Sequence, residues 1–387
     1  MAKKFFSDLG FVSTKTVRLP GFQTTFGYTF PYIDINYLEL GKLNEKKDNV
    51  ILVTHALSGN ALVAGQDKET GAIGWWDDYV GPGKAIDTNQ FYVICSNVIG
   101  GCNGSTGPTS INPMTNKPYN MQFPPITIQD MVKAQTILLD YLEIPKLFAV
   151  IGGSMGGMQS LVWSLLYPEK VHLCIPIATC MAHSAIQIAF NEVGRQAIIT
   201  DPNWNQGDYT PEKRPEHGLA VARMIGHITY LSAEIMEKKF GRKLQRNPEP
   251  SDIFPIFFSV ESYLQYQGES FVKRFDPNSY LYITKALDMF DWFQNIQNIE
   301  EAVKKIQSKF LVISFDSDWL YPPEQSKQIV KILKRANKSV TYMNLSTSYG
   351  HDSFLIPNPE LSKVLHSFLK VEYNLFNEEK ISNTYAL

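Results

Sequence analysis

Cysteine is scarce in this chain, and the few cysteines present are not arranged as a scaffold. Four of the 387 residues are cysteines, no Cys-x-x-Cys pair occurs, and their spacing matches no zinc module. So little cysteine excludes a small secreted fold held together by disulfides. We expect free thiols, mostly buried in apolar segments, in a protein of a reducing compartment.

Long apolar runs and an excess of one charge are missing as well. No segment reaches about 18 consecutive apolar residues, so we expect no membrane-spanning helix and no membrane partner. Asp8 and Lys15 interrupt the apolar residues near the N-terminus before a signal-peptide core can form, which favours a cytoplasmic location. The 36 basic and 38 acidic residues give a net charge of −2, without the basic excess typical of nucleic-acid binders.

Short apolar runs between polar turns recur along the chain, in an ordinary globular composition with 44% hydrophobic residues. Alternating residues around Phe30–Leu38 indicate antiparallel strands at the edge of a sheet. The later runs are typical of buried parallel strands: Val50–Thr54, Phe91–Ser96, Phe148–Ile151, Leu173–Ala178, Phe310–Phe315 and Val340–Leu345.

Helical patterns lie between several of these runs. In Thr127–Leu142 the apolar residues recur at helical spacing, with Thr127 as a plausible N-cap and Asp130 at the third helical position. A second helix is predicted over Gly156–Tyr167, ended by Pro168. Alternation of strands and helices predicts an α/β fold, a mostly parallel sheet with helices on both faces.

The alternation stops near residue 180 and resumes near 309. The segment between them holds amphipathic stretches, namely Ile186–Thr200, Pro215–Phe240, Ser259–Phe271 and Tyr280–Trp292. We expect a helical cap domain inserted over the carboxyl ends of the strands. The predicted division is a core at 1–181, a cap at 182–307, the rest of the core at 308–370 and a loosely held polar tail at 371–387.

The segment Val150–Met158 contains Gly152-x-Ser154-x-Gly156 between a predicted strand and a predicted helix. This is the pattern of a nucleophile elbow, in which a sharp turn exposes a serine hydroxyl at the N-terminus of the helix. Glycines on either side relieve the crowding of the turn. The alternatives are a turn without chemistry or a phosphate-cradling turn, but the spacing does not match Gly-x-Gly-x-x-Gly. We expect Ser154 to be a nucleophile.

A serine nucleophile needs a base and an acid that orients the base, in the chain order serine, acid, histidine for this kind of elbow. The strand Phe310–Phe315 leads into Asp316 and Asp318, and the next strand leads into His351 in a glycine-flanked loop. These loops meet at one edge of a parallel sheet. The residues predict His351 as the base and leave the choice between Asp316 and Asp318 open.

The oxyanion of an acyl-transfer intermediate needs backbone N–H donors. One is expected at Met155, directly after the nucleophile. The strand Val50–Thr54 ends in His55-Ala56-Leu57, and we assign the second donor to Leu57. An ordinary strand end is the alternative for this segment.

Several longer stretches resemble the homoserine O-acetyltransferase family of the α/β-hydrolase superfamily. The glycine-rich segment at 97–108 is far more specific than the elbow, and the resemblance runs in register over roughly residues 12–370. The matching stretches are His55-Ala56-Leu57-Ser58-Gly59, Gly74-Trp75-Trp76-Asp77, Gly81-Pro82-Gly83-Lys84, the segment 97–108, Gly152–Gln159, Ala222–Tyr230 and Gly350-His351-Asp352.

The resemblance implies roles for individual residues. It makes Ser154 the nucleophile and His351 the base, and it selects Asp318 as the acid. It points to Arg195 for the carboxylate of the substrate, and to Asp352 for its amine. Tyr230 is a weaker candidate for the substrate pocket. Homoserine is a zwitterion, so one arginine and one carboxylate match its two charges.

The implied activity is transfer of an acetyl group from acetyl-CoA to the hydroxyl of L-homoserine, by a ping-pong route in methionine biosynthesis. The resemblance implies no metal and no tightly bound cofactor, and it suggests a homodimer formed through the cap helices. Succinyl-CoA as donor, L-serine as acceptor and a simple esterase are alternatives on the same fold. A catalytically inactive binding module is a further alternative, which the complete set Ser154, Asp318 and His351 argues against.

Overall fold

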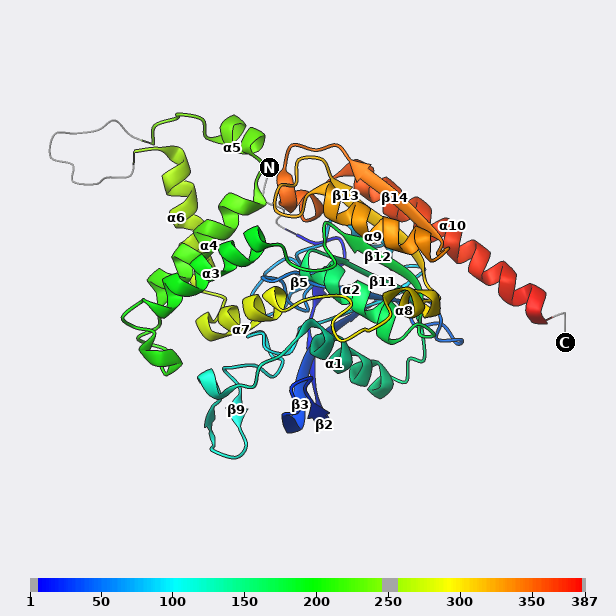
Figure 1. Ribbon diagram of the computed structural model, residues 1–387, viewed down its shortest axis with the longest axis horizontal. Coiled ribbons are helices and arrows are strands. Elements are labelled where there is room, and N and C mark those ends of the chain that lie inside the picture. The colour runs from blue at the N-terminus through cyan, green and yellow to red at the C-terminus, as the bar shows by residue number, and fades with distance from the viewer. Residues whose placement is uncertain (1–5, 246–256, 385–387) are drawn as a thin grey trace.

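A mostly parallel sheet lies at the centre of the molecule (Figure 1). The structure is a computed structural model, and it describes residues 6–245 and 257–384. Within these residues the largest sheet has eight strands in the order β14-β13-β12-β11-β4-β8-β3-β2. In chain order they are β2 (Lys15–Gln23), β3 (Thr29–Leu40), β4 (Val50–Thr54), β8 (Tyr92–Ser96), β11 (Leu147–Gly153), β12 (Val171–Ile177), β13 (Lys309–Phe315) and β14 (Val340–Leu345).

The pairing of the strands agrees with the sequence. β2 pairs with β3, and β3 with β8, in antiparallel fashion, whereas the other neighbours are parallel. Every residue of β4 and β11 is buried, as parallel strands covered on both faces require. The predicted α/β fold is confirmed, and its strands lie where the apolar runs placed them.

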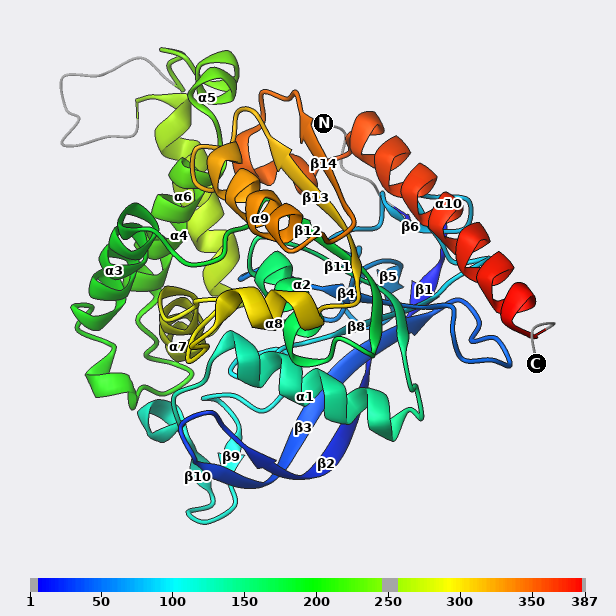
Figure 2. The ribbon, with the colours of Figure 1, turned by 45° about the vertical axis from the view of Figure 1, so that its right-hand side comes forward.

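Alternate residues of the central strands enter two hydrophobic cores. Val50 and Leu52 point to the core shared with α1 (Ile128–Tyr141), α2 (Met155–Leu166) and α9 (Pro323–Arg335). Ile51 belongs to the opposite core, which α10 (Pro359–Thr384) covers together with the segment 61–91. Figure 2 shows α10 apart from α1, α2 and α9. The sheet is therefore covered on both faces.

The predicted start of α1 is confirmed in detail. The Thr127 hydroxyl accepts a hydrogen bond from the Asp130 amide at 3.1 Å, and the Asp130 carboxylate accepts one from the Thr127 amide at 3.0 Å. This reciprocal pair satisfies two donors that a helix start leaves free. The Asp130 carboxylate also accepts from the Thr25 amide at 2.7 Å, which ties α1 to the β2–β3 hairpin.

Residues 182–307 hold the helices expected of a cap. They are α3 (Ala185–Ile199), α4 (Glu216–Tyr230), α5 (Ala233–Lys239), α6 (Ser259–Val272), α7 (Pro277–Asp288) and α8 (Ile299–Lys305). Figure 1 shows α3 to α7 gathered at one side of the sheet. The stretch expected as one helix over Pro215–Phe240 is divided, because Leu231 is extended and the Ser232 hydroxyl caps α5 by accepting from the Ile235 amide at 3.1 Å.

The C-terminal segment differs from the expected loose tail, because α10 continues through Thr384. Two of its aromatic residues lie against the sheet: the Tyr373 ring is 5.0 Å from that of Phe148, and the Phe376 ring is 5.5 Å from it. Val371 and Leu375 of the same helix are exposed. Composition alone therefore suggested a looser tail than the structure has.

Shorter elements complete the described chain. They are β1 (Phe11–Val12), β5 (Gln66–Asp67), β6 (Val80–Gly81), β7 (Ile86–Asp87), β9 (Ile111–Asn112), β10 (Lys117–Pro118) and the 3₁₀ turns η1 (Asn120–Gln122), η2 (Asn205–Gly207) and η3 (Gly350–Phe354). None of the helices in residues 6–245 and 257–384 is both long and apolar enough to cross a membrane.

Candidate active site

Ser154 occupies a sharp turn between β11 and α2. Its backbone has φ 57° and ψ −122°, a conformation that side chains rarely adopt and that costs on the order of 1–3 kcal/mol. The surroundings impose this conformation: a Cβ on Gly152 would collide with the Thr54 hydroxyl, and one on Gly156 would collide with the Thr54 carbonyl. The turn thus has the close approach and the strained serine that define a nucleophile elbow.

The structure brings His351 and Asp318 together. The His351 Nδ1 lies 2.7 Å from the Asp318 carboxylate, and both side chains are almost completely buried. The other carboxylate oxygen accepts from the amides of Leu320 and Tyr321, at 3.0 and 2.8 Å. With Nδ1–H directed at Asp318, Nε2 is left as the proton acceptor, which is the tautomer that a general base needs.

Asp316, the other candidate acid, points elsewhere. Its carboxylate accepts from the Ser346 hydroxyl at 2.7 Å and from the Thr347 amide at 2.9 Å, at the exposed end of β13 and β14. These hydrogen bonds hold the pKa of Asp316 below its usual value, against the effect of burial. Its partners are those of a loop residue, and its role in the structure is to join two strand ends.

Tyr321 lies in the loop that follows Asp318 and contacts both His351 and Ser154. No role was predicted for it from the sequence. Its ring stacks on that of His351 with centroids 4.7 Å apart, and its hydroxyl lies 2.7 Å from His183 Nε2. Burial raises the pKa of the Tyr321 phenol well above its usual value, and a hydrogen bond with Ser154 opposes that rise. Tyr321 therefore packs against the base and also contacts the nucleophile.

The loop that carries Leu57 is held by a neutral histidine. His55 Nδ1–H donates to the Ala56 carbonyl at 2.8 Å, and its Nε2 accepts from the Val98 amide at 3.1 Å. Burial lowers the pKa of His55 to about 4, so the ring keeps both bonds at neutral pH. The Gln159 side chain of α2 donates to the His55 carbonyl at 3.1 Å, which fixes this loop against the elbow helix.

A small cavity of about 50 Å³ opens onto Ser154. Leu57 and Tyr230, both predicted site residues, line it, as do His183 and Tyr321. Met155 is the first residue of α2, and amides at a helix start lack partners within the helix. Leu57 thus lines the same cavity as Ser154, and Met155 follows the serine in the chain. Their roles as oxyanion donors stay predictions.

The turn between α4 and α5 is fixed to both catalytic loops. The Trp319 indole donates to the Leu231 carbonyl at 2.9 Å, and the Ser232 hydroxyl donates to the Ser348 carbonyl. Gly350 has φ +70°, and a Cβ on it would meet the Ser232 amide nitrogen at 2.6 Å. The cap therefore contacts the predicted acid loop and the predicted base loop at this corner. The fit leaves no room for a side chain at position 350.

Arg223 of α4 lies beside Tyr230, one of the predicted substrate residues. Its guanidinium carbon is 5.5 Å from the centre of the Tyr230 ring, and its Nη1 donates to the Ser58 hydroxyl at 3.3 Å. Its Nε is buried without a hydrogen-bond partner. Burial raises the pKa of Asp352, and the charges of His351 and Arg223 oppose that rise. An arginine and a carboxylate thus face the same region.

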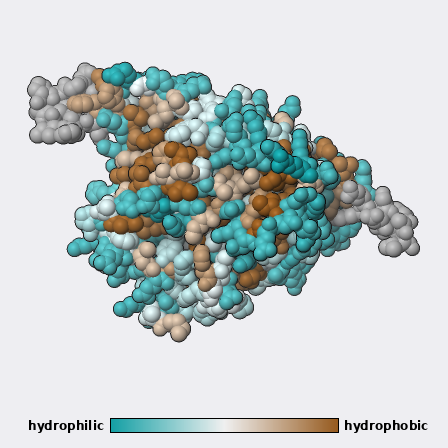
Figure 3. All heavy atoms as spheres, in the orientation of Figure 1, coloured by the Kyte–Doolittle hydropathy of each residue, from teal (hydrophilic) through white to brown (hydrophobic). Residues whose placement is uncertain are grey.

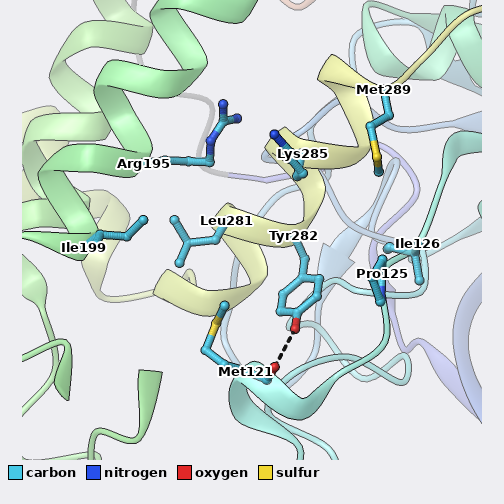
Figure 4. Close-up of a pocket in the computed structure, with 9 residues that line it drawn as sticks. All are labelled: Met121, Pro125, Ile126, Arg195, Ile199, Leu281, Tyr282, Lys285 and Met289. Carbon is cyan, nitrogen blue, oxygen red and sulfur yellow. Dashed lines mark hydrogen bonds between the residues drawn. The ribbon is translucent and has the colours of Figure 1, made fainter. Parts of the chain in front are cut away.

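Arg195 lies on α3 in a different environment. Its Nη2 is 2.7 Å from both Glu192 and Asp288, so two carboxylates already offset its charge. It lines a cavity of about 290 Å³, and its partner Asp288 also accepts from Asn191, a residue that lines the Ser154 cavity, at 2.7 Å. Figure 4 shows Arg195 beside Lys285 and the apolar side chains of that cavity. Its assignment to the substrate carboxylate stays a prediction, and the structure offers Arg223 as an alternative.

The residues missed at the level of sequence carried only faint signals. Arg223 stands in Ala222–Tyr230, one of the stretches that carry the family resemblance, yet only Tyr230 was selected from it. Tyr321 follows Asp318 by three residues, within the predicted acid loop. His183 begins the cap, where no pattern relates it to the serine. For Arg223 and Tyr321, the available signal was that each lies close in sequence to a motif selected for another residue.

Comparison with known proteins agrees with this geometry. A family model described as the alpha/beta hydrolase fold matches residues 49–355. The chain is 53% identical over 363 residues to the homoserine O-acetyltransferase of Methanococcus vannielii, which covers 94% of this chain and 74% of that protein. It is also 53% identical to the homoserine O-acetyltransferase of Leptospira biflexa, over 94% of this chain and 95% of that protein.

Solved structures give the same result. The crystal structure of a homoserine O-acetyltransferase from Bacillus anthracis superposes with a TM-score of 0.86 at 29% identity, covering 92% of this chain and 97% of that one. Esterase E22 superposes with a TM-score of 0.84 at 33% identity, covering 92% and 99%. The elbow at Ser154 and the identity with these relatives support the same conclusion: the chain belongs to the homoserine O-acetyltransferase family of the α/β-hydrolase fold.

Proposed function

We propose that the protein transfers an acetyl group from acetyl-CoA to the hydroxyl of L-homoserine, in methionine biosynthesis. The contact between His351 and Asp318, beside a strained Ser154, carries this proposal together with the relatives that bear the name of that activity. The proposed reaction uses side chains and backbone amides throughout, and it requires no metal and no tightly bound cofactor.

The first half-reaction forms an acetyl-enzyme. His351 Nε2 takes the proton of Ser154, whose Oγ attacks the thioester carbonyl of acetyl-CoA. The amides of Met155 and Leu57 donate to the resulting oxyanion. The carbon–sulfur bond then breaks, the His351 proton passes to the departing sulfur, and CoA leaves an ester on Ser154.

The second half-reaction uses the same groups in reverse. The homoserine hydroxyl gives its proton to His351 and attacks the ester carbonyl, after which Ser154 leaves and recovers the proton. Water could replace homoserine here, so the enzyme must favour its acceptor. The narrow cavity over Ser154, enclosed by core and cap residues alike, restricts how much water competes.

The carboxylate and ammonium groups of homoserine need oppositely charged partners. We assign the carboxylate to Arg223, because no carboxylate within the described residues forms an ion pair with it, whereas Arg195 is already paired with Glu192 and Asp288. We keep Asp352 for the ammonium, since an adjacent cation would stabilise a carboxylate whose pKa burial has raised. Tyr230 lies against Arg223 and closes the cavity beside them.

An esterase is the second candidate, because esterase E22 shares this fold at 33% identity. A charged pair such as Arg223 and Asp352 is not needed by a simple esterase. The distinguishing experiment follows thiol release from acetyl-CoA or succinyl-CoA, with homoserine, L-serine or no acceptor. Release that depends on homoserine supports the proposal, whereas equal release without an acceptor would favour the esterase.

The cap also offers a surface for a second copy of the chain. Apolar side chains are exposed along α3 and α4, and Figure 3 shows hydrophobic atoms gathered over the cap helices. They are Ile186, Ile188, Val193, Ile199, Val221 and Ile228, each between 37% and 54% exposed. Since patches of this kind mark interfaces, we propose a homodimer formed through these helices. A cytoplasmic location fits the four free cysteines.

Ser154→Ala should abolish acetyl transfer, because it removes the attacking oxygen. Loss of one member of such a triad typically lowers the rate by about 10⁴- to 10⁶-fold. Wild type mixed with acetyl-CoA alone should gain one acetyl mass on the peptide that contains Ser154, measured by rapid-quench mass spectrometry. A variant that keeps several per cent of the activity would contradict the assignment.

Asp318→Asn should lower the turnover rate by roughly 10⁴-fold, since the amide no longer stabilises the His351 imidazolium. Asp316→Asn is the matched control, and it should stay close to wild type because it loses only loop contacts. Steady-state rates of both variants show which aspartate is the acid that orients His351. A larger loss in Asp316→Asn would reverse the choice of acid.

Arg223→Ala should leave the formation of the acetyl-enzyme largely unchanged and weaken transfer to homoserine by about 2–5 kcal/mol, the range for removing one partner of a buried charge pair. Arg195→Ala breaks the contact with Asp288 and should lower thermal stability, with similar effects on both half-reactions. Timing each half-reaction separately compares the two. If Arg195→Ala alone impairs the second half, the carboxylate belongs to Arg195.

Ile228→Asp should convert the dimer to monomers, because it places a charge in the centre of the exposed apolar face of α4. Met114→Asp, at an 84% exposed position in the β9–β10 hairpin, serves as the control. Sedimentation velocity at equal concentrations gives the masses. A monomeric wild type, or a dimer that survives Ile228→Asp, would remove these helices from the interface.

A further inference from the structure

A cavity of about 490 Å³ lies beside the cap, outside the residues assigned so far. Its walls come from the glycine-rich segment at Cys102, the loop before α4 and the segment that joins α6 to α7. Three cationic side chains, Arg214, Lys273 and Arg274, line it.

The three cations lack carboxylate partners. Arg214 donates to the Phe275 carbonyl at 2.6 Å and Arg274 to the Ser58 carbonyl at 2.9 Å, and both acceptors are neutral. Among the described residues, no carboxylate forms an ion pair with any of the three. The Asp276 carboxylate also lines the cavity, but it accepts from the Ser279 amide at 2.7 Å and from the Tyr209 hydroxyl at 2.6 Å. The cavity is therefore left with excess positive charge.

Arg274 links this cavity to the catalytic residues. It also lines a second cavity, of about 320 Å³, together with Ala56, Ser58 and Arg223. Ser58 follows Leu57, which lines the cavity over Ser154. The first two cavities thus share Arg274, and Ala56 and Ser58 of the second flank Leu57, which lines the cavity over Ser154.

We propose that Arg214, Lys273 and Arg274 bind the phosphate groups of the acyl-CoA nucleotide, and that its pantetheine arm passes Ser58 to bring the thioester to Ser154. The inference rests on the proposed function, because it takes acyl-CoA as the donor. Coenzyme A carries its phosphates at the end opposite to its sulfur, so a phosphate site must lie away from the serine. Guanidinium groups match phosphate oxygens with paired hydrogen bonds, and a lysine adds a point charge.

The electrostatics of Arg274 agree with a bound anion. Burial, followed by the charge of Arg223, lowers the pKa of Arg274 to about 10. A phosphate beside the two guanidinium groups would offset both effects by supplying negative charge and charged hydrogen-bond acceptors.

Lys273 gives the cleanest test, because it is exposed at the end of α6 and its side chain has no hydrogen bond or ion pair within the described residues. Lys273→Glu should weaken the binding of CoA about tenfold, measured by titration calorimetry, since attraction becomes repulsion at the rim of the site. Lys273→Gln should have a smaller effect in the same direction. Lys331→Glu, at an exposed position of α9, is the matched control and should bind CoA like wild type.

Turnover of two donors provides the second readout. Lys273→Glu should raise the KM for acetyl-CoA and leave unchanged the kcat/KM for S-acetyl-N-acetylcysteamine, a thioester without phosphates. Hydrolysis of p-nitrophenyl acetate should also be unchanged, which shows that the triad is intact.

Each contrary result has a separate meaning. Unaltered CoA binding in Lys273→Glu, or equal losses with both thioesters, would overturn the phosphate site. Inorganic phosphate that binds in a Lys273-dependent manner without competing with CoA would also overturn it, as an anion site of another kind. By contrast, a wild type that releases no CoA in response to homoserine would refute the proposed function, while the shift in CoA affinity would still support the site.

Discussion

The close contact between the elbow and the end of β4 is the constraint on which the active site depends. Gly152 and Gly156 touch the backbone and hydroxyl of Thr54, and no side chain fits at either glycine. The Thr54 hydroxyl also donates to the Gly156 carbonyl at 2.8 Å. Thr54 leads directly into His55 and the loop of Leu57. One contact therefore fixes the positions of both the nucleophile and an expected oxyanion donor.

The cap adds a second set of constraints from the opposite side. His183 contacts the Tyr321 hydroxyl, and the Gln187 side chain of α3 donates to the Leu320 carbonyl at 2.8 Å. Asp318 accepts from the amides of these same two loop residues. The loop that holds the acid is thus fixed by its own backbone on one side and by the cap on the other. A core without the cap would lack the contacts that His183 and Gln187 make with this loop.

The core could be predicted from the sequence because each signal was local. Apolar runs marked the strands, and Thr127 and Asp130 marked a helix start. The elbow marked Ser154, and the loop after a later predicted strand marked His351. The choice between Asp316 and Asp318 depended on the family resemblance, since both follow the same strand and only their side-chain directions differ.

The cap and the C-terminus were harder because their contacts are not local. Arg195 and Arg223 both lie on amphipathic helices, and the sequence does not say which is left without a carboxylate beside Tyr230 and which is neutralised by neighbours such as Asp288. In the C-terminal segment, Tyr373 and Phe376 were outnumbered by polar residues. Their partner Phe148 lies more than 200 positions away, on β11.

The corner where the α4–α5 turn meets the catalytic loops has a consequence for how the enzyme opens. Trp319, Ser232 and Gly350 fasten the cap to the loops of the acid and the base, and the fit at Gly350 tolerates no separation by a side chain. A cap that lifted at this corner would carry His351 with it and disassemble the triad. The cap is bonded to the core elsewhere too, since the Trp292 indole donates to the Leu161 carbonyl at 2.8 Å and Arg274 donates to the Ser58 carbonyl at 2.9 Å. Substrates that enter without breaking these contacts leave the predicted proton-transfer geometry intact.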